Sequence, residues 1–284
     1  MIPAAFEYAR AKNLRDALNA LAAGDGSKLL AGGHSLLPLM RFRLAQPPKL
    51  VDIGELAELK GIAEKGRGLR LGALTTYRQI LDSPLVRERA PLLADAAYTI
   101  GDIQVRNRGT IGGALAHADP AADLPAVLLV LDAAIHARSK AGKRAIPARD
   151  FFLGAFTTAL APDELLTEIV IPPVPRGART AYVSHEQAAS GYALVGVAAL
   201  VVGARKITQC RVAITGVTDC AFLAGSAERL VGTAGDAAAI AAVADGALLG
   251  IETSGDIHAP ADYRAHLARV AVRRALTTAL GRSP

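Results

Sequence analysis

The stretch KLLAGGHSLLPLM, residues 28–40, contains the first of two double-glycine turns that decide how this chain folds. The second turn is Thr110-Ile111-Gly112-Gly113. Each follows a short extended segment and precedes a segment of helical character. Paired glycines let the backbone approach a ligand closely and point N–H groups at it, and the positive end of a following helix favours an anion. The two turns together predict that a pyrophosphate is held from two directions.

Neither turn matches a standard nucleotide-binding fingerprint. G-x-G-x-x-G and G-x-x-x-x-G-K-[ST] are both missing, which argues against a conventional dinucleotide fold and against a nucleoside-triphosphatase loop. Taken singly, a double glycine is more often a tight strand-to-helix turn, so the pairing carries the ligand hypothesis. Ser35 adds a hydroxyl donor, and we expect it also to cap a helix that runs through Arg43.

Polar side chains follow the second turn. His117, Asp119 and Asp123 stand in otherwise small and apolar sequence. The two carboxylates could accept hydrogen bonds from sugar or ribityl hydroxyls, and capping of a helix that starts at Leu124 explains them equally well. The stretch 101–123 lacks a sustained period of either kind, so we expect an irregular segment, and long irregular segments are often functional.

Hydrophobic periodicity outlines the remaining elements. In the first half it predicts helices over 14–23, 76–81, 91–97 and 124–131, and strands over 28–31, 50–53, 69–73, 134–138 and 165–171. In the second half it predicts strands over 193–202 and 211–217, followed by helices over 223–230, 237–249 and 262–280. Three prolines between residues 172 and 175 mark the clearest boundary. The first half alternates too irregularly for a doubly wound sheet, and we predict an α+β fold.

Charge and hydropathy exclude further classes. The chain carries 32 basic and 26 acidic residues, a net charge of +6, but its basic residues are scattered and it has no tryptophan. Nucleic-acid binding is therefore disfavoured, whereas a basic surface facing an acidic partner fits. The most apolar stretch, 124–135, is too short to span a bilayer, and charges at Glu7, Arg10 and Lys12 argue against a signal peptide. We predict a cytoplasmic protein, with association at the inner face of the membrane left open.

The two cysteines, Cys210 and Cys220, are too few for an all-cysteine iron–sulfur cluster or a four-cysteine zinc site. The six histidines show no metal-binding spacing. We expect both thiols to be free and buried. A redox cofactor on this chain would thus be held by something other than side-chain ligation.

Four segments together carry a resemblance to a known family. They are KLLAGGHSLLPLM, IGDIQVRNRGTIGGALAHADPAADLPA (100–126), LLTEIVIP (165–172) and ASGYALVGVAA (189–199). In this order and spacing the chain resembles, over nearly its whole length, the FAD-binding medium subunit of molybdenum hydroxylases. The pattern is closest to aerobic carbon monoxide dehydrogenase medium chains, and the xanthine dehydrogenase flavin domain is a more distant match.

The resemblance implies a fold and a division into domains. It implies an α+β chain with a vanillyl-alcohol-oxidase-type FAD-binding domain over residues 1–174, made of two α/β subdomains at about 1–55 and 56–174. A C-terminal domain of antiparallel sheet and helices follows over 175–284.

The resemblance also implies the residues around a non-covalently bound FAD. In that family the first turn surrounds the pyrophosphate and the second holds it from the other side, while Tyr192 covers one face of the isoalloxazine and Asp123 contacts a hydroxyl. It implies no catalytic residue and no metal ligand on this chain. The implied cofactor contacts are Leu29, Leu30, Ala31, Gly32, Gly33, His34, Ser35, Leu36, Ile100, Thr110, Ile111, Gly112, Gly113, His117, Asp119, Asp123, Leu165, Leu166 and Tyr192.

The implied function is electron transfer inside a complex. Electrons would pass from a molybdenum cofactor on a large subunit, through two [2Fe–2S] clusters on a small subunit, to FAD on this chain and on to an external acceptor. Relatives form dimers of such heterotrimers. Arg106 and Arg108 are candidates for the subunit interface, although solvated loop arginines explain them equally well.

One segment departs from the family pattern. Many relatives carry lysines and arginines just before the tyrosine, where this chain has SHEQAA at 184–189. A cation there would stabilise reduced anionic flavin, so its absence leaves the flavin potential open. His185 is the one candidate substitute, and we interpret it as a surface histidine.

Two other functions compete with this interpretation. A free-standing FAD-dependent oxidase would need a substrate domain and an acid–base pair, for which the chain is short and offers no constellation near Tyr192. A nucleotide-binding regulatory module would be colourless. The sequence names neither the hydroxylated substrate nor the acceptor, which could be a quinone, oxygen or a nicotinamide.

Overall fold

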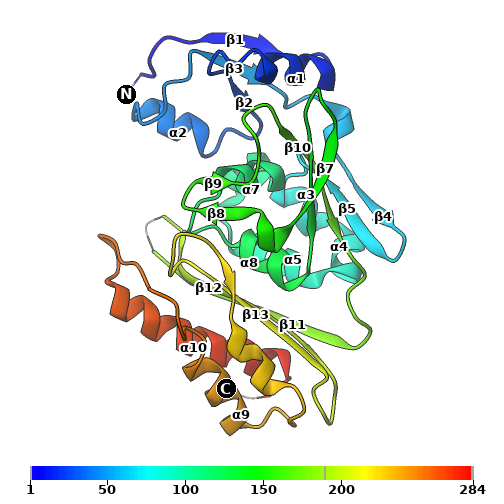
Figure 1. The fold of residues 1–284 in the computed structure, drawn as a ribbon, viewed down its shortest axis with the longest axis vertical. Helices are drawn as coiled ribbons and strands as arrows, with labels where there is room; N and C mark the ends of the chain where they lie inside the picture. Colours follow the sequence, from blue (N-terminus) through cyan, green and yellow to red (C-terminus); the bar gives the residue numbers. More distant parts are fainter. Residues whose placement is uncertain (1, 189, 283–284) are drawn as a thin grey trace.

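The computed structural model describes residues 2–188 and 190–282 and shows an elongated molecule, with three larger sheets along its long axis and a separate two-stranded sheet (Figure 1). Ala189, the last residue of the SHEQAA segment, lies outside the described residues. The N-terminal sheet is at one end of the molecule, the largest sheet is in the middle, and the C-terminal sheet with its long helix is at the other end.

The N-terminal layer is a small parallel sheet with the strand order β1-β3-β2, formed by β1 (Glu7–Arg10), β2 (Lys28–Leu30) and β3 (Lys49–Asp52). Its crossovers contain α1 (Leu14–Ala22) and α2 (Leu36–Arg41). Asn13 caps α1 by accepting a hydrogen bond from the Asp16 amide. The apolar stripe of α1 packs into a core that includes Val51.

The middle layer is an antiparallel sheet with the order β4-β5-β10-β6-β7. Helices between β5 and β6 pack between this sheet and the C-terminal one (Figure 1). The strands are β4 (Ile62–Lys65), β5 (Gly68–Gly72), β6 (Ala134–Arg138), β7 (Lys143–Pro147), the hairpin β8 (Phe152–Gly154) and β9 (Thr157–Thr158), and β10 (Leu165–Ile171). The helices are the short 3₁₀ turns η1 (Ala57–Leu59) and η2 (Ala148–Asp150), with α3 (Tyr77–Asp82), α4 (Pro84–Arg89), α5 (Pro91–Thr99), α6 (Ile103–Arg108), α7 (Ile111–His117) and α8 (Leu124–Val130).

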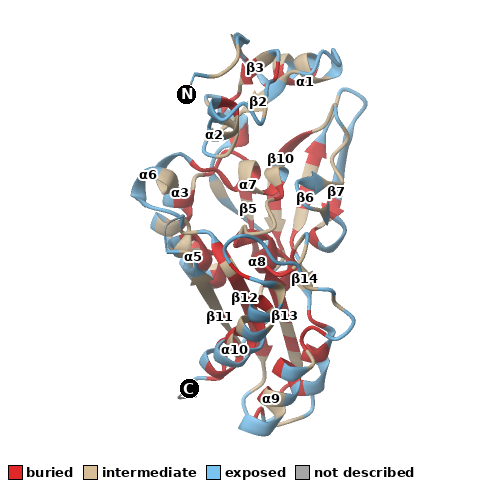
Figure 2. Ribbon diagram, turned by 90° about the vertical axis from the view of Figure 1, so that its left-hand side faces the viewer, coloured by how far each residue is buried: buried red, intermediate tan, exposed pale blue. Residues whose placement is uncertain are grey.

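The C-terminal layer is an antiparallel sheet of β11 (Ala178–Glu186), β12 (Ala193–Val202), β13 (Gln209–Thr215) and β14 (Phe222–Leu223). It is followed by η3 (Gly225–Leu230), α9 (Ala237–Asp245) and α10 (Ala261–Ala279). Helices cover both faces: α10 packs on one, α5 and α8 on the other. Along β12, Ala198 belongs to the core shared with α5 and α8, and its neighbours Val197 and Ala199 belong to the core on the α10 side. Burial on both faces explains the near-continuous apolar run of β12, in which Leu194 and Val202 are of intermediate burial and the other residues are buried (Figure 2).

The α+β class predicted from the sequence is confirmed, with corrections to single elements. The stretch 101–123 is not irregular, because Asp102 and Thr110 cap the short helices α6 and α7, which are too brief to show a period. Residues 223–230 form the end of β14 and a 3₁₀ turn rather than an α-helix. The helix after Ser35 ends at Arg41, because Arg43 has a left-handed φ of 59°.

Both cysteines are free thiols: Cys210 is buried on β13, whereas Cys220 is only half-buried. Burial raises the pKa of Cys210 to about 12, which leaves its thiol protonated. Among residues 2–188 and 190–282, we find no helix with the length and hydropathy needed to cross a membrane.

Candidate flavin site

The two double-glycine turns lie against each other, backbone to backbone. A β-carbon on Gly32 would overlap the carbonyl oxygen of Arg108 and would lie 3.1 Å from the α-carbon of Gly109. A β-carbon on Gly113 would lie 4.0 Å from that of Ala31. Segments almost eighty residues apart in sequence therefore meet at one place, as the pairing of the motifs predicts.

The first turn presents unpaired backbone donors. Gly33 has a left-handed φ of 78°, which favours glycine. Within the described part of the chain, the amides of residues 32–36 donate to no protein acceptor, although the Gly33 carbonyl accepts from Leu37. Ser35 occupies the N-cap position of α2, but its side chain makes no capping hydrogen bond, which corrects the capping expectation. A run of free amides with a free hydroxyl beside it is suited to phosphate oxygens.

The second turn uses its amides inside the protein. The amide of Ile111 donates to the carbonyl of Thr75 at 2.9 Å, and that of Gly112 donates to the carbonyl of Ala73 at 2.8 Å. Gly113 donates to the Thr110 hydroxyl at 3.2 Å, which caps α7. Gly112 also has no room for a side chain, because a β-carbon would lie 2.6 Å from that of Ala73. The amides of Ile111 and Gly112 therefore lock α7 onto the end of β5 and are not free for a phosphate.

The polar residues after the second turn form a short loop. His117 ends α7 and its ring lies 5.1 Å from that of Phe156. Burial lowers the pKa of His117, so its imidazole is neutral near pH 7. Its Nε2 lies 3.9 Å from Oδ2 of Asp119, and the other carboxylate oxygen of Asp119 accepts from the Ala121 amide at 2.9 Å.

Asp123 is the buried carboxylate of the site, with 5% of its surface exposed. It precedes α8 but makes no capping hydrogen bond, which excludes the capping interpretation for this residue. Its Oδ1 instead accepts from the hydroxyl of Tyr182 at 2.6 Å, with the Ser184 hydroxyl at 3.5 Å. Burial, opposed by the Tyr182 hydrogen bond, raises the pKa of Asp123 to about 6.

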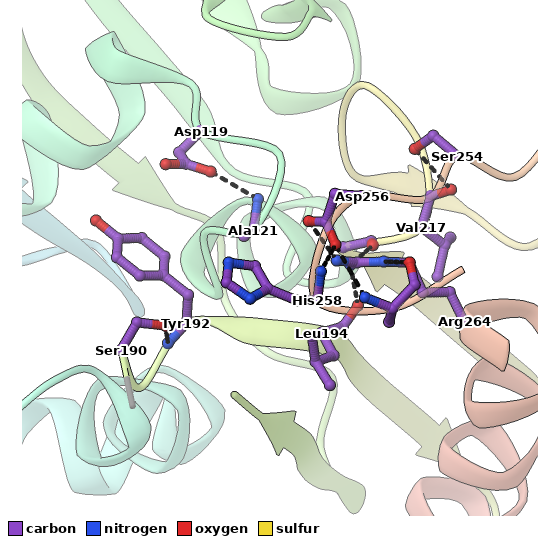
Figure 3. Close-up of polar contacts among 12 residues, drawn as sticks. Asp119, Ala121, Ser190, Tyr192, Leu194, Val217, Ser254, Asp256, His258 and Arg264 are labelled. Atoms are coloured by element: carbon purple, nitrogen blue, oxygen red, sulfur yellow. Dashed lines mark hydrogen bonds and ion pairs between the residues drawn. The ribbon is translucent and has the colours of Figure 1, made fainter. Parts of the chain in front are cut away.

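Tyr192 immediately precedes β12 and faces the loop of Asp119 and Ala121 (Figure 3). It is 47% exposed and, unlike its strand neighbours, belongs to neither core. The preceding Gly191, with φ of 70°, packs on Gly101, whose α-carbon would lie 3.7 Å from a β-carbon on Gly191. The residue before Tyr192 thus packs on the residue after Ile100, the C-cap of α5.

The remaining apolar candidates are divided between two cores and the first turn. Leu165 and Leu166 are consecutive on β10 and point to opposite faces of the sheet. Leu165 belongs to the N-terminal core on which Leu29 and Ala31 pack, whereas Leu166 belongs to the larger core on which Ile100 packs. Leu30 is half-buried at the end of β2, His34 is exposed, and Leu36 begins α2.

Two sequence interpretations are corrected by the geometry. His185 is not a surface histidine: it lies on the α10 side of β11, where its Nε2 is buried and Arg274 helps to lower its pKa after burial. It therefore faces away from Asp123 and is no substitute for a cation at the flavin. Arg106 is not a solvated loop arginine, because its Nη1 donates to the carbonyls of Tyr98, Ile100 and Gly101 and so holds the end of α5; its place at a subunit interface stays a prediction.

The sequence analysis missed the residues that the C-terminal domain contributes. Arg264, 6% exposed, donates to the carbonyls of Leu194 and Gly216 at 2.7 and 2.5 Å and to Asp256 at 2.7 Å (Figure 3). These bonds tie α10 to the strand that begins beside Tyr192. One feature of the sequence could have indicated a buried arginine: Arg264 occupies the apolar stripe of α10 together with Ala268, Ala271 and Ala275.

Comparison with known proteins assigns this arrangement. The family described as "FAD binding domain in molybdopterin dehydrogenase" matches residues 4–174, and the family described as "CO dehydrogenase flavoprotein C-terminal domain" matches residues 180–279. The two double-glycine turns thus belong to an FAD-binding flavoprotein.

Full-length relatives narrow the class. The carbon monoxide dehydrogenase medium chain of Hydrogenophaga pseudoflava is 40% identical over 99% of both chains. The 6-hydroxypseudooxynicotine dehydrogenase complex subunit alpha of Paenarthrobacter nicotinovorans is 37% identical over 100% of this chain and 97% of that protein. A solved carbon monoxide dehydrogenase from Hydrogenophaga pseudoflava, lacking the Mo-pyranopterin moiety of its molybdenum cofactor, superposes with a TM-score of 0.96, at 40% identity and 100% coverage of both chains. The chain belongs to the family of FAD-binding medium subunits of molybdenum-containing, carbon monoxide dehydrogenase-type oxidoreductases.

Proposed function

We propose that this chain binds one FAD non-covalently and serves as the electron-transfer subunit of a molybdenum-containing dehydrogenase. The observation that carries the proposal is the run of unpaired amides at 32–36. This run packs against Gly109, the residue that directly precedes the second turn. Such a cradle accommodates phosphate oxygens and leaves no space for a side chain at Gly32. Residues 1–174 would form the FAD-binding domain, in two parts divided near residue 55, and residues 175–284 would close it.

Each predicted contact then has a physical role. The amides of Gly32 to Leu36 and the Ser35 hydroxyl would donate to the pyrophosphate, with Gly113 across from Ala31 on the other side. Asp119 and Asp123 would accept from cofactor hydroxyls, because each retains a carboxylate oxygen without a close donor in the described part of the chain. Tyr192 would cover one face of the ring.

The chain's own contribution to catalysis would be to place and tune the flavin. Bound FAD supplies the reversible uptake of electrons, and the protein fixes its orientation and electrostatic surroundings. The titratable neighbours that raise the pKa of Tyr192, after burial, are Asp119 and Asp123, and we assign both carboxylates to cofactor hydroxyls rather than to proton transfer with a substrate. This supports an electron carrier rather than a free-standing oxidase.

The partners are inferred from the family and from the number of cysteines available to ligate iron–sulfur clusters. Two cysteines cannot hold the iron–sulfur clusters that feed such a flavin, so a small [2Fe–2S] subunit would supply them and a large subunit the molybdenum cofactor. We expect a heterotrimer, doubled into a dimer of heterotrimers, that passes electrons to an external acceptor. The scattered positive charge of +6 suits acidic partner surfaces.

Cofactor analysis of the full-length chain tests the proposal. The purified protein is denatured and the released flavin is identified by chromatography. We expect about one FAD per chain, because one cofactor fills one such site. Release of FMN would contradict the pyrophosphate cradle, flavin retained on the precipitated polypeptide would contradict non-covalent binding, and a colourless protein that takes up no FAD would contradict the proposed function.

A further inference from the structure

The loop that carries Asp119 and Asp123 belongs to the first half of the chain but is held by the C-terminal sheet. The carbonyl of Pro120 lies 2.8 Å from the Thr215 hydroxyl and accepts from the Gly216 amide at 2.9 Å. The same hydroxyl lies 2.9 Å from the carbonyl of Ala122. The end of β13 therefore fixes the backbone between the two aspartates.

A neighbouring strand holds the Asp123 side chain directly. Tyr182 on β11 donates to Asp123 at 2.6 Å, and burial raises the pKa of Tyr182, so it remains a donor at any physiological pH. Alternate residues of a strand share one face, so Tyr182 and Ser184 point to the same side of the sheet.

The strand β12, which lies between β11 and β13, has a glycine where their side chains need room. In the sheet register, Gly196 of β12 lies opposite both Ser184 and Thr215. A β-carbon on Gly196 would overlap the Tyr182 hydroxyl and would lie 2.8 Å from the Thr215 methyl group. Gly196 is part of the ASGYALVGVAA segment, and its role is to let these two hydroxyl-bearing side chains meet the loop.

We propose that Tyr182 and Thr215 are positioning residues for the flavin: they set the 119–123 loop and the Asp123 carboxylate, and so make cofactor binding depend on the C-terminal domain. The inference rests on the proposed function and adds two residues that the family resemblance does not supply. Neither side chain needs to touch the cofactor, because both act through the backbone of residues 120–122 and through Asp123.

The test compares isosteric variants of the full-length chain. Tyr182→Phe and Thr215→Val each remove only hydroxyl contacts, and we expect each to weaken FAD affinity by about tenfold, which is the loss of one or two buried hydrogen bonds. We also expect both to change the visible circular dichroism and the reduction potential of the bound flavin. Thr215→Ser retains the hydroxyl and should restore the affinity and the flavin signal.

Thr233→Val is the matched control. Thr233 belongs to the same domain but lies away from the loop, and its hydroxyl donates to the Leu230 carbonyl at 2.8 Å. Loss of this contact should lower stability without altering the flavin signals. Unchanged affinity, dichroism and potential in both Tyr182→Phe and Thr215→Val would overturn the proposal. The proposal would also be overturned if the loss of FAD affinity in these variants were only proportional to the fall in unfolding temperature, as in the control. If the unaltered chain binds no FAD at all, the proposed function fails instead, which separates the two outcomes.

Discussion

Gly32 lies so close to the carbonyl of Arg108 that a single methyl group on Gly32 would occupy the space of the oxygen. This contact joins the two turns on which the whole site depends. In the second turn, Gly112 is required for a different reason: a β-carbon there would lie 2.6 Å from the β-carbon of Ala73.

Gly32→Ala therefore separates the turns. We expect it to abolish FAD retention and to lower the free energy of unfolding by about 1–3 kcal/mol, the usual cost of overpacking. Gly142→Ala is the control, since a β-carbon on Gly142 would meet no atom within 4 Å. Flavin content and denaturant unfolding measure both effects, and full flavin occupancy in Gly32→Ala would show that the contact is dispensable.

Ser35→Ala tests whether the free hydroxyl serves the ligand rather than the helix. Because Ser35 makes no capping bond, we expect unchanged stability of the FAD-free chain and an FAD affinity weakened by about 1 kcal/mol, one hydrogen bond. Asn13→Ala should behave in the opposite way, with about 1 kcal/mol lost in stability and unchanged affinity, because Asn13 caps α1. Fluorescence titration and thermal unfolding distinguish the two patterns, and equal affinity for Ser35→Ala and the unaltered chain would remove Ser35 from the site.

Tyr192→Ala tests the stacking role. The side chain is 47% exposed and belongs to neither core, so we expect folding to survive while the absorbance of the bound flavin shifts and its reaction with oxygen accelerates. Tyr263 on α10 is 48% exposed, which makes Tyr263→Ala a matched control with unaltered flavin properties. An unshifted spectrum and unchanged oxygen reactivity in Tyr192→Ala would show that the ring does not cover the flavin.

The buried carboxyl of Asp123 should make the stability of the FAD-free chain depend on pH. Its folded pKa of about 6 lies above the ordinary value of 3.8, so protonation favours the folded state. This contribution is fully present below about pH 4 and is lost as pH rises through 6; the difference in pKa corresponds to about 3 kcal/mol.

Asp123→Asn removes that titration while retaining an acceptor for Tyr182. Urea unfolding of both proteins between pH 4 and 7 gives the difference in free energy of unfolding, in which other titrating groups cancel. We expect the unaltered chain to lose stability relative to Asp123→Asn as pH rises through this window. A difference that stays constant with pH would show that the folded and unfolded pKa values of Asp123 are alike.

The sequence predicted the fold where local pattern and tertiary structure agree. The regular periods of α1, β10, β12 and α10 all correspond to observed elements, and the paired glycine motifs correctly indicated that two distant turns meet. The sequence-based prediction failed where helix starts depend on single capping bonds, as in α6 and α7. There the side chains of Asp102 and Thr110 each accept one hydrogen bond, from the amides of Val105 and Gly113.

The partners of the polar groups could not be predicted either. Asp123 reads equally as a cap and as a ligand, and only the fold brings Tyr182 to it across 59 residues. Thr215 and Gly196 look like ordinary strand residues, because their roles arise from register between three strands. Non-local hydrogen bonds of this kind leave no local period in a sequence.

The last prediction is that this chain oxidises no substrate by itself. The described residues contain no group of three or more histidine, cysteine, aspartate or glutamate side chains that could hold a metal ion, and the sequence has only two cysteines. Under the proposed function, other polypeptides would supply the centres that reduce the flavin. We expect native extract to yield the chain in a complex containing iron and molybdenum, as size-exclusion chromatography with mass spectrometry and metal analysis would show. The isolated chain should bind FAD, accept electrons from a chemical reductant, and leave the substrate of the complex unoxidised. A lone chain that turns over that substrate without iron or molybdenum would contradict this prediction, because such a chain would have to contain the substrate site itself.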